Sequence, residues 1–135
     1  MTAMARRVVV GCFDPRIMEE MYNRAREGVP AGKVTFILPP GGSININARW
    51  PDLEMAICDL GADELWSFAH EDCLGCKKTY GEDRKDYHLK HLRGLETKVR
   101  KTFVTITQIR LFYMSRISDE EWVVEEVNST VLLTA

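Results

Sequence analysis

Residues 7–16 read RVVVGCFDPR, and this stretch decides which class of fold we expect. Its three consecutive valines are β-branched and apolar, which is typical of a strand buried in a parallel sheet. Cys12 follows the strand directly, and Asp14 and Arg16 lie two and four residues further on. Since ligands of open α/β sheets bind at the carboxyl ends of the strands, we expect chemistry at this point of the chain.

Hydrophobic periodicity divides the rest of the chain into alternating strands and helices. It predicts five strands, at residues 7–12, 33–38, 64–69, 103–114 and 121–127. It predicts three helices, at residues 17–25, 51–60 and 82–101. The prolines and glycines of residues 39–47 (PPGGSININ) predict a loop, and residues 70–83 (HEDCLGCKKTYGED) are expected to form a second loop.

This order of elements predicts an α/β fold in a single domain over residues 1–135. Alternating strands and helices imply a mostly parallel sheet, of order about 2-1-3-4, with helices on both faces. A short turn separates the last two strands, so the C-terminal strand is expected to lie antiparallel at an edge. In this order strands one and three are neighbours, and a ligand crevice lies at their carboxyl ends.

Three potential metal ligands follow those two neighbouring strands. Cys12 ends the first strand, and His70 and Cys73 follow the third. The predicted topology would bring these residues together, although they are far apart in the sequence. Two thiolates and an imidazole are a favourable ligand set for zinc, and three protein ligands leave the fourth position open for water. The sequence therefore predicts a zinc site of the catalytic type.

The composition limits the classes of partner. The net charge is -2 with 28% charged residues, which gives no reason to expect nucleic acid. No apolar run approaches the roughly 20 residues that span a bilayer, so no membrane partner is expected. The start, MTAMARRVVVGCFD, lacks a signal-peptide core, and we expect a cytoplasmic protein. Four cysteines in that compartment favour metal ligands, catalytic groups or buried thiols over a disulfide framework.

The two motifs carry a resemblance to a known family. C-x-D-x-R at residues 12–16, followed by H-x-x-C at residues 70–73, resembles the signature of the β-class carbonic anhydrases. The resemblance runs from about residue 7 to residue 127. The chain differs from the family pattern at Phe13 and Pro15, within the first motif, and in the loop at residues 38–42.

The resemblance implies zinc-dependent, reversible hydration of carbon dioxide to bicarbonate by a zinc-bound hydroxide. It implies one zinc ion per chain, held by Cys12, His70 and Cys73. It also implies that Asp14 and Arg16 form a catalytic pair, in which Arg16 keeps Asp14 ionised and away from the metal. Asp14 would then accept the hydrogen of the hydroxide and aim its lone pair at the substrate. The family's zinc cleft is completed by a second subunit, so a homodimer or higher homo-oligomer is expected.

Other functions remain open at this point. The altered loop at residues 38–42 admits carbonyl sulfide or carbon disulfide as the substrate of a hydrolase on the same site. Cys76, three residues after Cys73, could be the fourth ligand of a non-catalytic zinc-binding domain. It could also form a redox dithiol with Cys73, or be an unliganded thiol near the start of a helix.

Three further expectations concern side chains outside the motifs. His88 and His91 lie on a polar helix, where a solvated face is favoured over a proton-shuttle role. Cys58 lies on an apolar helix face and is expected in the core. Phe112 and Tyr113 are expected to be exposed on the fourth strand, where they would favour a second subunit.

Overall fold

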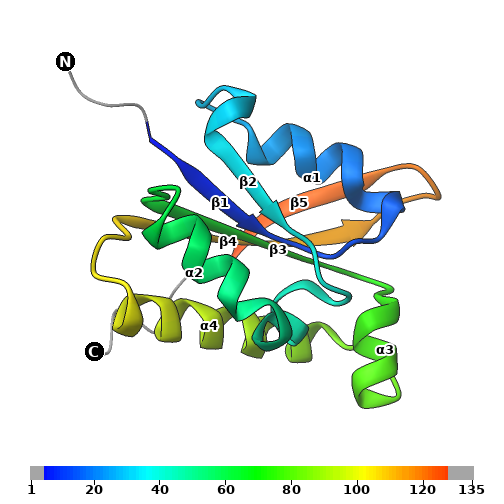
Figure 1. The fold of residues 1–135 in the computed structure, drawn as a ribbon. Helices are drawn as coiled ribbons and strands as arrows, with labels where there is room; N and C mark the ends of the chain where they lie inside the picture. Colours follow the sequence, from blue (N-terminus) through cyan, green and yellow to red (C-terminus); the bar gives the residue numbers. More distant parts are fainter. Residues whose placement is uncertain (1–4, 128–135) are drawn as a thin grey trace.

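The centre of the molecule is a sheet of five strands in the order β2-β1-β3-β4-β5 (Figure 1). The structure is a computed structural model and describes residues 5–127. The strands are β1 (Arg7–Val10), β2 (Val34–Ile37), β3 (Glu64–His70), β4 (Gln108–Arg116) and β5 (Trp122–Val127). The α-helices are α1 (Met18–Ala25), α2 (Trp50–Cys58), α3 (Leu74–Tyr80) and α4 (Lys85–Thr102). Short 3-10 helices precede α1, β2 and α2, at η1 (Pro15–Ile17), η2 (Ala31–Lys33) and η3 (Gly42–Arg49).

The strand directions confirm the predicted topology. β1 pairs in parallel with β2 and β3, and β3 pairs in parallel with β4. β5 runs antiparallel to β4 at the edge of the sheet. The register places Val10, at the end of β1, opposite Ser67 of β3, and β3 continues for three more residues to His70. The carboxyl ends of these two strands therefore lie side by side.

Helices cover both faces of the sheet, as predicted (Figure 1). β1 is buried on both faces, because its successive side chains point to opposite sides. Val8 and Val10 pack in the core formed with α2 and α4, whereas Val9 packs in the core formed with α1. The first core also contains Leu53, Ile57, Leu92, Leu95 and Val99, and the second contains Ile17, Met21, Ala25, Phe68 and Phe112.

The structure differs from the sequence prediction in three segments. Residues 39–47 do not form an open loop, because η3 occupies most of them. The predicted loop at 70–83 contains a complete helix, α3. The fourth strand begins at Gln108 rather than at residue 103, because Phe103 ends α4 and its amide donates to the carbonyl oxygen of Val99.

A glycine contact seats α3 next to the loop that follows β2. A Cβ atom at position 75 would lie 2.3 Å from the Gly41 nitrogen and 2.5 Å from the Pro40 carbonyl carbon. No side chain fits at that distance, so Gly75 is required for this backbone approach. The contact fixes the loop at residues 40–42 beside the end of β1.

The predicted domain of residues 1–135 includes residues 1–4 and 128–135, which lie outside the described residues. The expectation that the N-terminus carries no signal peptide rests partly on residues 1–4, so it lies partly outside the described residues as well. Over residues 5–127 the chain forms one α/β unit around one sheet. Within the same range, no helix has both the length and the apolar character needed to cross a membrane.

Candidate metal centre

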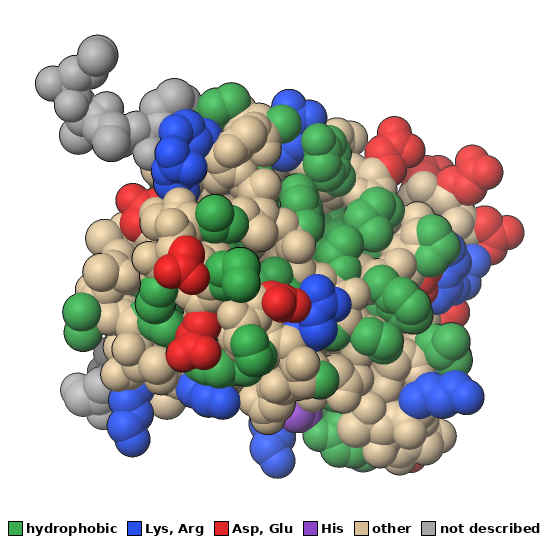
Figure 2. All heavy atoms as spheres, viewed as in Figure 1, with side chains coloured by type: hydrophobic (Ala, Val, Ile, Leu, Met, Phe, Trp, Pro, Cys, Tyr) green, Lys and Arg blue, Asp and Glu red, His purple; other side chains and the backbone are tan. Residues whose placement is uncertain are grey.

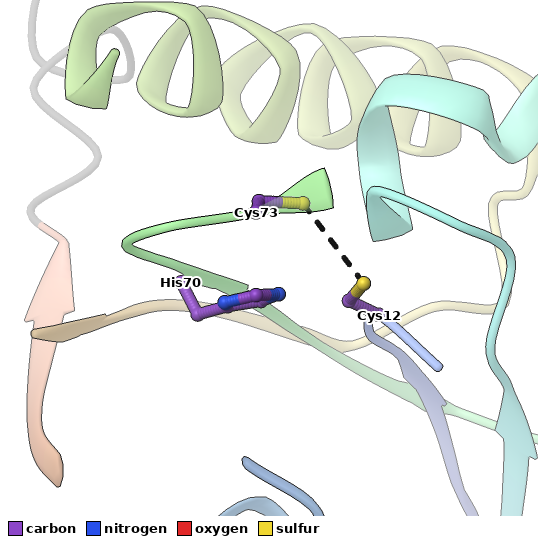
Figure 3. A group of neighbouring side chains, drawn as sticks. All are labelled: Cys12, His70 and Cys73. Atoms are coloured by element: carbon purple, nitrogen blue, oxygen red, sulfur yellow. Dashed lines mark hydrogen bonds between the residues drawn. The ribbon is translucent and has the colours of Figure 1, made fainter. Parts of the chain in front are cut away.

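Three buried ligand residues converge at the carboxyl ends of β1 and β3 (Figure 3). Cys12 lies two residues beyond β1, His70 is the last residue of β3, and Cys73 is the N-cap residue of α3. Their ligand atoms lie within 4.8 Å of one another, and all three side chains are buried. We call this group the strand-end cluster. The sheet order places these residues together, although 61 positions separate Cys12 from Cys73.

The hydrogen bonds of His70 determine which ring nitrogen is free. Nδ1 lies 2.8 Å from the carbonyl oxygen of Glu71, and a carbonyl only accepts, so Nδ1 carries the hydrogen. Nε2 is then a lone-pair acceptor, and one ring nitrogen points toward Cys12 in Figure 3. Nε2 is buried and has no hydrogen-bond partner among residues 5–127. A metal-binding histidine has the same pattern, with its second nitrogen held by a carbonyl or carboxylate.

The two thiols of the strand-end cluster lie close enough to form a hydrogen bond with each other. Cys12 Sγ lies 3.9 Å from Cys73 Sγ and accepts the Gly41 N–H at 3.3 Å. The hydrogen bond from Cys73, together with His70 and the Gly41 amide, lowers the pKa of Cys12 despite its burial. The same hydrogen bond and burial raise the pKa of Cys73. Burial opposes the charged form of His70, but Cys12, the Glu71 carbonyl and Asp14 together outweigh it and raise the pKa of His70.

The strand-end cluster fits a zinc ion. Two zinc–sulfur bonds of about 2.3 Å at a tetrahedral angle span about 3.8 Å. The observed sulfur separation of 3.9 Å matches that span. The unpartnered Nε2 of His70 supplies the third donor, and no fourth protein donor belongs to this group among the described residues. The cluster can therefore hold zinc with one position left for water or substrate.

Asp14 and Arg16 form a closed ion pair on η1, directly after Cys12. Arg16 Nη2 lies 2.6 Å from Asp14 Oδ2, and Arg16 Nε donates to both carboxylate oxygens at 3.1 Å. The Arg16 amide also donates to Asp14 Oδ1, which makes Asp14 the cap of η1. The guanidinium of Arg16 lowers the pKa of Asp14, so the carboxylate is ionised at neutral pH.

The sequence prediction missed Asp72, which completes the support of Arg16. Arg16 Nη1 donates to Asp72 Oδ2 at 3.0 Å, and Nη2 donates to the Asp72 carbonyl oxygen at 2.8 Å. Asp72 has a positive φ of 58° and is anchored by Asp83, which accepts its amide hydrogen at 2.9 Å. An acidic residue between the two ligands of H-E-D-C was the only signal in the sequence.

Trp122 is a second residue that the motifs did not indicate. Its ring meets the ring of His70 edge-on, with 5.8 Å between the centroids. Trp122 begins β5 and is 6% exposed, so the terminal hairpin covers one side of the strand-end cluster. The pairing of β5 with β4 places it there, and no local sequence pattern reveals that contact.

A hollow of about 260 Å³ opens beside the cluster. Its lining residues are Cys12, Phe13, Asp14, Pro15, Arg16 and Leu74. Phe13 and Leu74, which border this hollow, are 52% and 56% exposed. In the right half of Figure 2, on the side where the parallel strands of Figure 1 have their carboxyl ends, apolar side chains lie next to one another on the surface. The approach to the cluster is therefore mainly apolar.

Several side chains do not lie where the sequence predicted. Cys76 does not join the strand-end cluster; its sulfur groups with Asp83 and His88 instead, which removes the basis for a closed site with Cys76 as fourth ligand. His88 is fully buried rather than solvated, and Cys58 is exposed rather than in the core. The prediction that Phe112 and Tyr113 of β4 are exposed was also wrong, because these side chains are 0% and 3% exposed.

Comparison with known proteins identifies the fold. No family model matches the sequence, and no curated protein matches it. The solved carbonic anhydrase from Glaciozyma antarctica is similar with a TM-score of 0.57 and 14% identity, over 95% of this chain and 85% of that chain. The β-carbonic anhydrase CafA of the fungal pathogen Aspergillus fumigatus gives a TM-score of 0.53 and 12% identity, over 93% and 76%. A tetrameric β-carbonic anhydrase from the filamentous ascomycete Sordaria macrospora gives 0.52 and 13%, over 94% and 82%.

These similarities confirm the fold that the two motifs predicted. The chain has the fold of the β-carbonic anhydrases, in a divergent form. The identities of 12–14% establish the architecture, and the chemistry has to be argued from the site.

Proposed function

We propose that this chain is a zinc-dependent carbonic anhydrase, which converts carbon dioxide and water reversibly into bicarbonate and a proton. The observation that supports it most strongly is the convergence of Cys12, His70 and Cys73, with a buried, unpartnered Nε2 on the histidine. These three residues would hold the zinc ion. Zinc bound there would lower the pKa of a water molecule to about 7 and so provide hydroxide at neutral pH.

The remaining residues of the site would orient the reactants. Asp14, kept ionised by Arg16, would accept a hydrogen bond from that hydroxide and so turn an oxygen lone pair toward the substrate. Arg16 holds both oxygens of Asp14 and thereby keeps this carboxylate off the metal. Asp72 binds the opposite side of the same guanidinium and positions it. In this proposal Asp72 acts only through Arg16.

The walls of the hollow suit a small, apolar substrate. Phe13, Pro15 and Leu74 provide hydrocarbon surface beside the ligands, and carbon dioxide carries no charge or hydrogen-bond donor. Carbonyl sulfide and carbon disulfide share these properties and are slightly larger, so the same walls also accommodate the alternative hydrolase reaction. Relative rates on the three substrates would distinguish the two functions.

The direct test is a stopped-flow assay of CO2 hydration by protein reconstituted with zinc. We expect hydration that disappears when a chelator removes the metal and returns when zinc is restored. Carbonyl sulfide and carbon disulfide should be assayed on the same preparation. Zinc-loaded protein that consumes only a sulfur-containing substrate would replace carbonic anhydrase by the hydrolase, and inactivity on all three would reject both.

We propose that the protein forms a homo-oligomer. The Sordaria macrospora neighbour is described as tetrameric, and the hollow beside the metal centre is bordered by exposed Phe13 and Leu74. A second copy over these side chains would remove apolar surface from water and enclose the entrance. Light scattering should give a mass of at least two chains, and Phe13→Ser with Leu74→Ser should lower it. A single-chain mass at high concentration would contradict this proposal.

We propose the cytoplasm as the location. Cys12, Cys73 and Cys76 are free, buried thiols, and a reducing compartment keeps thiols from forming disulfides. Cell fractionation with an antibody against the protein should recover it with the cytosolic enzymes. Recovery from an oxidising compartment would contradict the assignment.

A further inference from the structure

A second group of ligand residues lies where α3 meets α4. Cys76 is in α3, Asp83 is in the connection between the two helices, and His88 is in the first turn of α4. Their ligand atoms lie within 4.8 Å of one another. Cys76 and His88 are 0% exposed, and the side chain of Asp83 is 11% exposed. We call this group the helix cluster.

In the helix cluster one ring nitrogen of His88 contacts Asp83 and the other has no partner among the described residues. His88 Nε2 lies 2.7 Å from Asp83 Oδ1. Nδ1 is buried, and within residues 5–127 it makes no hydrogen bond. The two ring nitrogens point in different directions, so Nε2, next to Asp83, is the nitrogen that can share a metal ion with this carboxylate. A zinc ion in place of the hydrogen between His88 Nε2 and Asp83 Oδ1 would bind both groups, and the Cys76 sulfur lies within 4.8 Å of them.

We propose that Cys76, Asp83 and His88 form a second zinc site, separate from the strand-end cluster. Sulfur, carboxylate oxygen and imidazole nitrogen are the three donor types of protein zinc sites. On binding, the Cys76 thiol gives its proton to the buffer as the zinc–sulfur bond forms, and no oxidation state changes. A structural zinc site needs a fourth ligand. The Glu82 carbonyl oxygen, 3.6 Å from Cys76 Sγ at the edge of the cluster, is placed to provide it.

The two sites are neighbours with separate ligands. The ring centroids of His70 and His88 are 6.4 Å apart. Cys73 and Cys76 are three residues apart, but their sulfurs belong to different groups. The connection above the helix cluster is exposed at Gly81, Glu82 and Arg84, which provides a short path for an ion from solvent.

A metal at the helix cluster would have a consequence for the first site. Asp83 Oδ2 accepts the amide hydrogen of Asp72 at 2.9 Å, and Asp72 in turn binds Arg16. Fixing Asp83 would therefore fix the positive-φ backbone of Asp72 and the guanidinium that orients Asp14. The second zinc would be structural, and its loss would reach the catalytic pair through Asp83.

Metal counting separates the two sites. Native mass spectrometry of the full chain, kept reduced and supplied with zinc, should give two ions per chain for the wild type. Cys73→Ser and Cys76→Ser should each retain one ion, and the double variant should retain none. Cys58→Ser, at an exposed thiol outside both clusters, is the matched control and should retain two.

Cadmium-113 NMR identifies which ion is lost. Cadmium-loaded wild type should show two signals, the more deshielded one from the cluster with two sulfurs. Cys76→Ser should remove only the less deshielded signal. Should Cys76→Ser fail to fold, His88→Gln provides the same test, because it removes a donor nitrogen and retains a polar side chain.

The outcomes distinguish this inference from the proposed function. A single zinc ion that Cys73→Ser abolishes and Cys76→Ser retains would overturn the second site and leave the hydratase proposal standing. Two ions, one lost with each substitution, support the second site even where the protein hydrates no CO2. A Cys76→Ser or His88→Gln protein that is folded and still binds two ions would also overturn it.

Discussion

The strand-end cluster and the helix cluster contain similar donors, but the fold assembles them in different ways. Cys12 and Cys73 are 61 residues apart and meet because β1 and β3 are adjacent strands. Cys76, Asp83 and His88 come from one short stretch, joined by the left-handed Gly81 that ends α3. The first cluster therefore depends on the whole sheet, whereas the second depends on one local connection.

This difference predicts different sensitivities. A change at the strand-end cluster removes the atoms that carry the chemistry, but the surrounding sheet retains its two cores. A change at the helix cluster leaves those atoms in place and loosens the connection that supports Asp72. We expect four effects of decreasing size, and the first three are each compared with a control variant elsewhere in the chain.

Loss of a strand-end ligand should have the largest effect. Cys73→Ser or His70→Ala should lose one zinc ion per chain and all CO2 hydration, because two protein donors hold zinc poorly. Cys76→Ser should lose one ion but retain measurable hydration, because no ligand of the strand-end cluster has changed. Zinc analysis and stopped-flow assays on the same samples provide both readouts. Equal loss of activity in Cys73→Ser and Cys76→Ser would contradict the claim that only the strand-end cluster carries the chemistry.

Arg16→Lys should have the next largest effect on CO2 hydration. Lysine is a point charge and cannot hold both Asp14 oxygens and Asp72 as the guanidinium does. We expect CO2 hydration to fall on the order of 10²-fold, as for other residues that position metal-site groups, with zinc content unchanged. Arg49→Lys, at the exposed pair with Asp52, is the matched control. Full activity in Arg16→Lys would refute the proposed role of the pair.

Gly75→Ala should lower the free energy of unfolding by about 1–3 kcal/mol, the usual cost of forcing a methyl group into a packed contact. The new Cβ would lie 2.3 Å from the Gly41 nitrogen, so α3 and the loop at residues 40–42 must move apart. The matched control is Gly94→Ala in α4, where nothing lies within 4 Å. That variant should gain about 0.5–1 kcal/mol from better helix propensity. Denaturant unfolding of the metal-free chain measures both, and equal stabilities would contradict the contact.

Asp72 should contribute a smaller effect that depends on pH. Hydrogen bonds from Lys77 and then Arg16 lower the pKa of Asp72 from 3.8 to about 2. A lowered folded-state pKa stabilises the fold above the unfolded value, and the contribution is lost as pH falls from about 4 to 2. Metal-free Asp72→Asn should therefore be less stable than wild type at pH 6, and the gap should close near pH 2. Because Asp72 is over one third exposed, high salt should reduce the gap. A gap independent of pH would exclude the carboxylate as its source.

The sequence made the strand-end cluster predictable because its signals are strong and local. Three consecutive valines indicated a buried strand, and the two motifs marked the ends of β1 and β3. Parallel topology then required those ends to meet, since strand order in such sheets follows few patterns. The candidate ligands Cys12, His70 and Cys73 and the pair Asp14 and Arg16 could be named before their distances were known.

The helix cluster could not be predicted in the same way. His88 lies among charged residues, and a helical pattern with polar neighbours indicates a solvated face. Its burial comes from tertiary packing beneath the connection to α3, beside Tyr113 of β4. Sequence patterns also failed for Cys58, which lies on an apolar helix but outside the side that packs against the sheet. They failed for α3 because its seven residues are too few to show a helical period.

The most direct test of the central claim is the rate of CO2 hydration by the zinc-loaded wild type between pH 6 and pH 9, with Cys73→Ser as the baseline. We predict a rate above that baseline which rises through about pH 7, as the water at the metal ionises. A zinc-loaded wild type whose rate equals that of Cys73→Ser at every pH would contradict the assignment of the strand-end cluster as a catalytic centre.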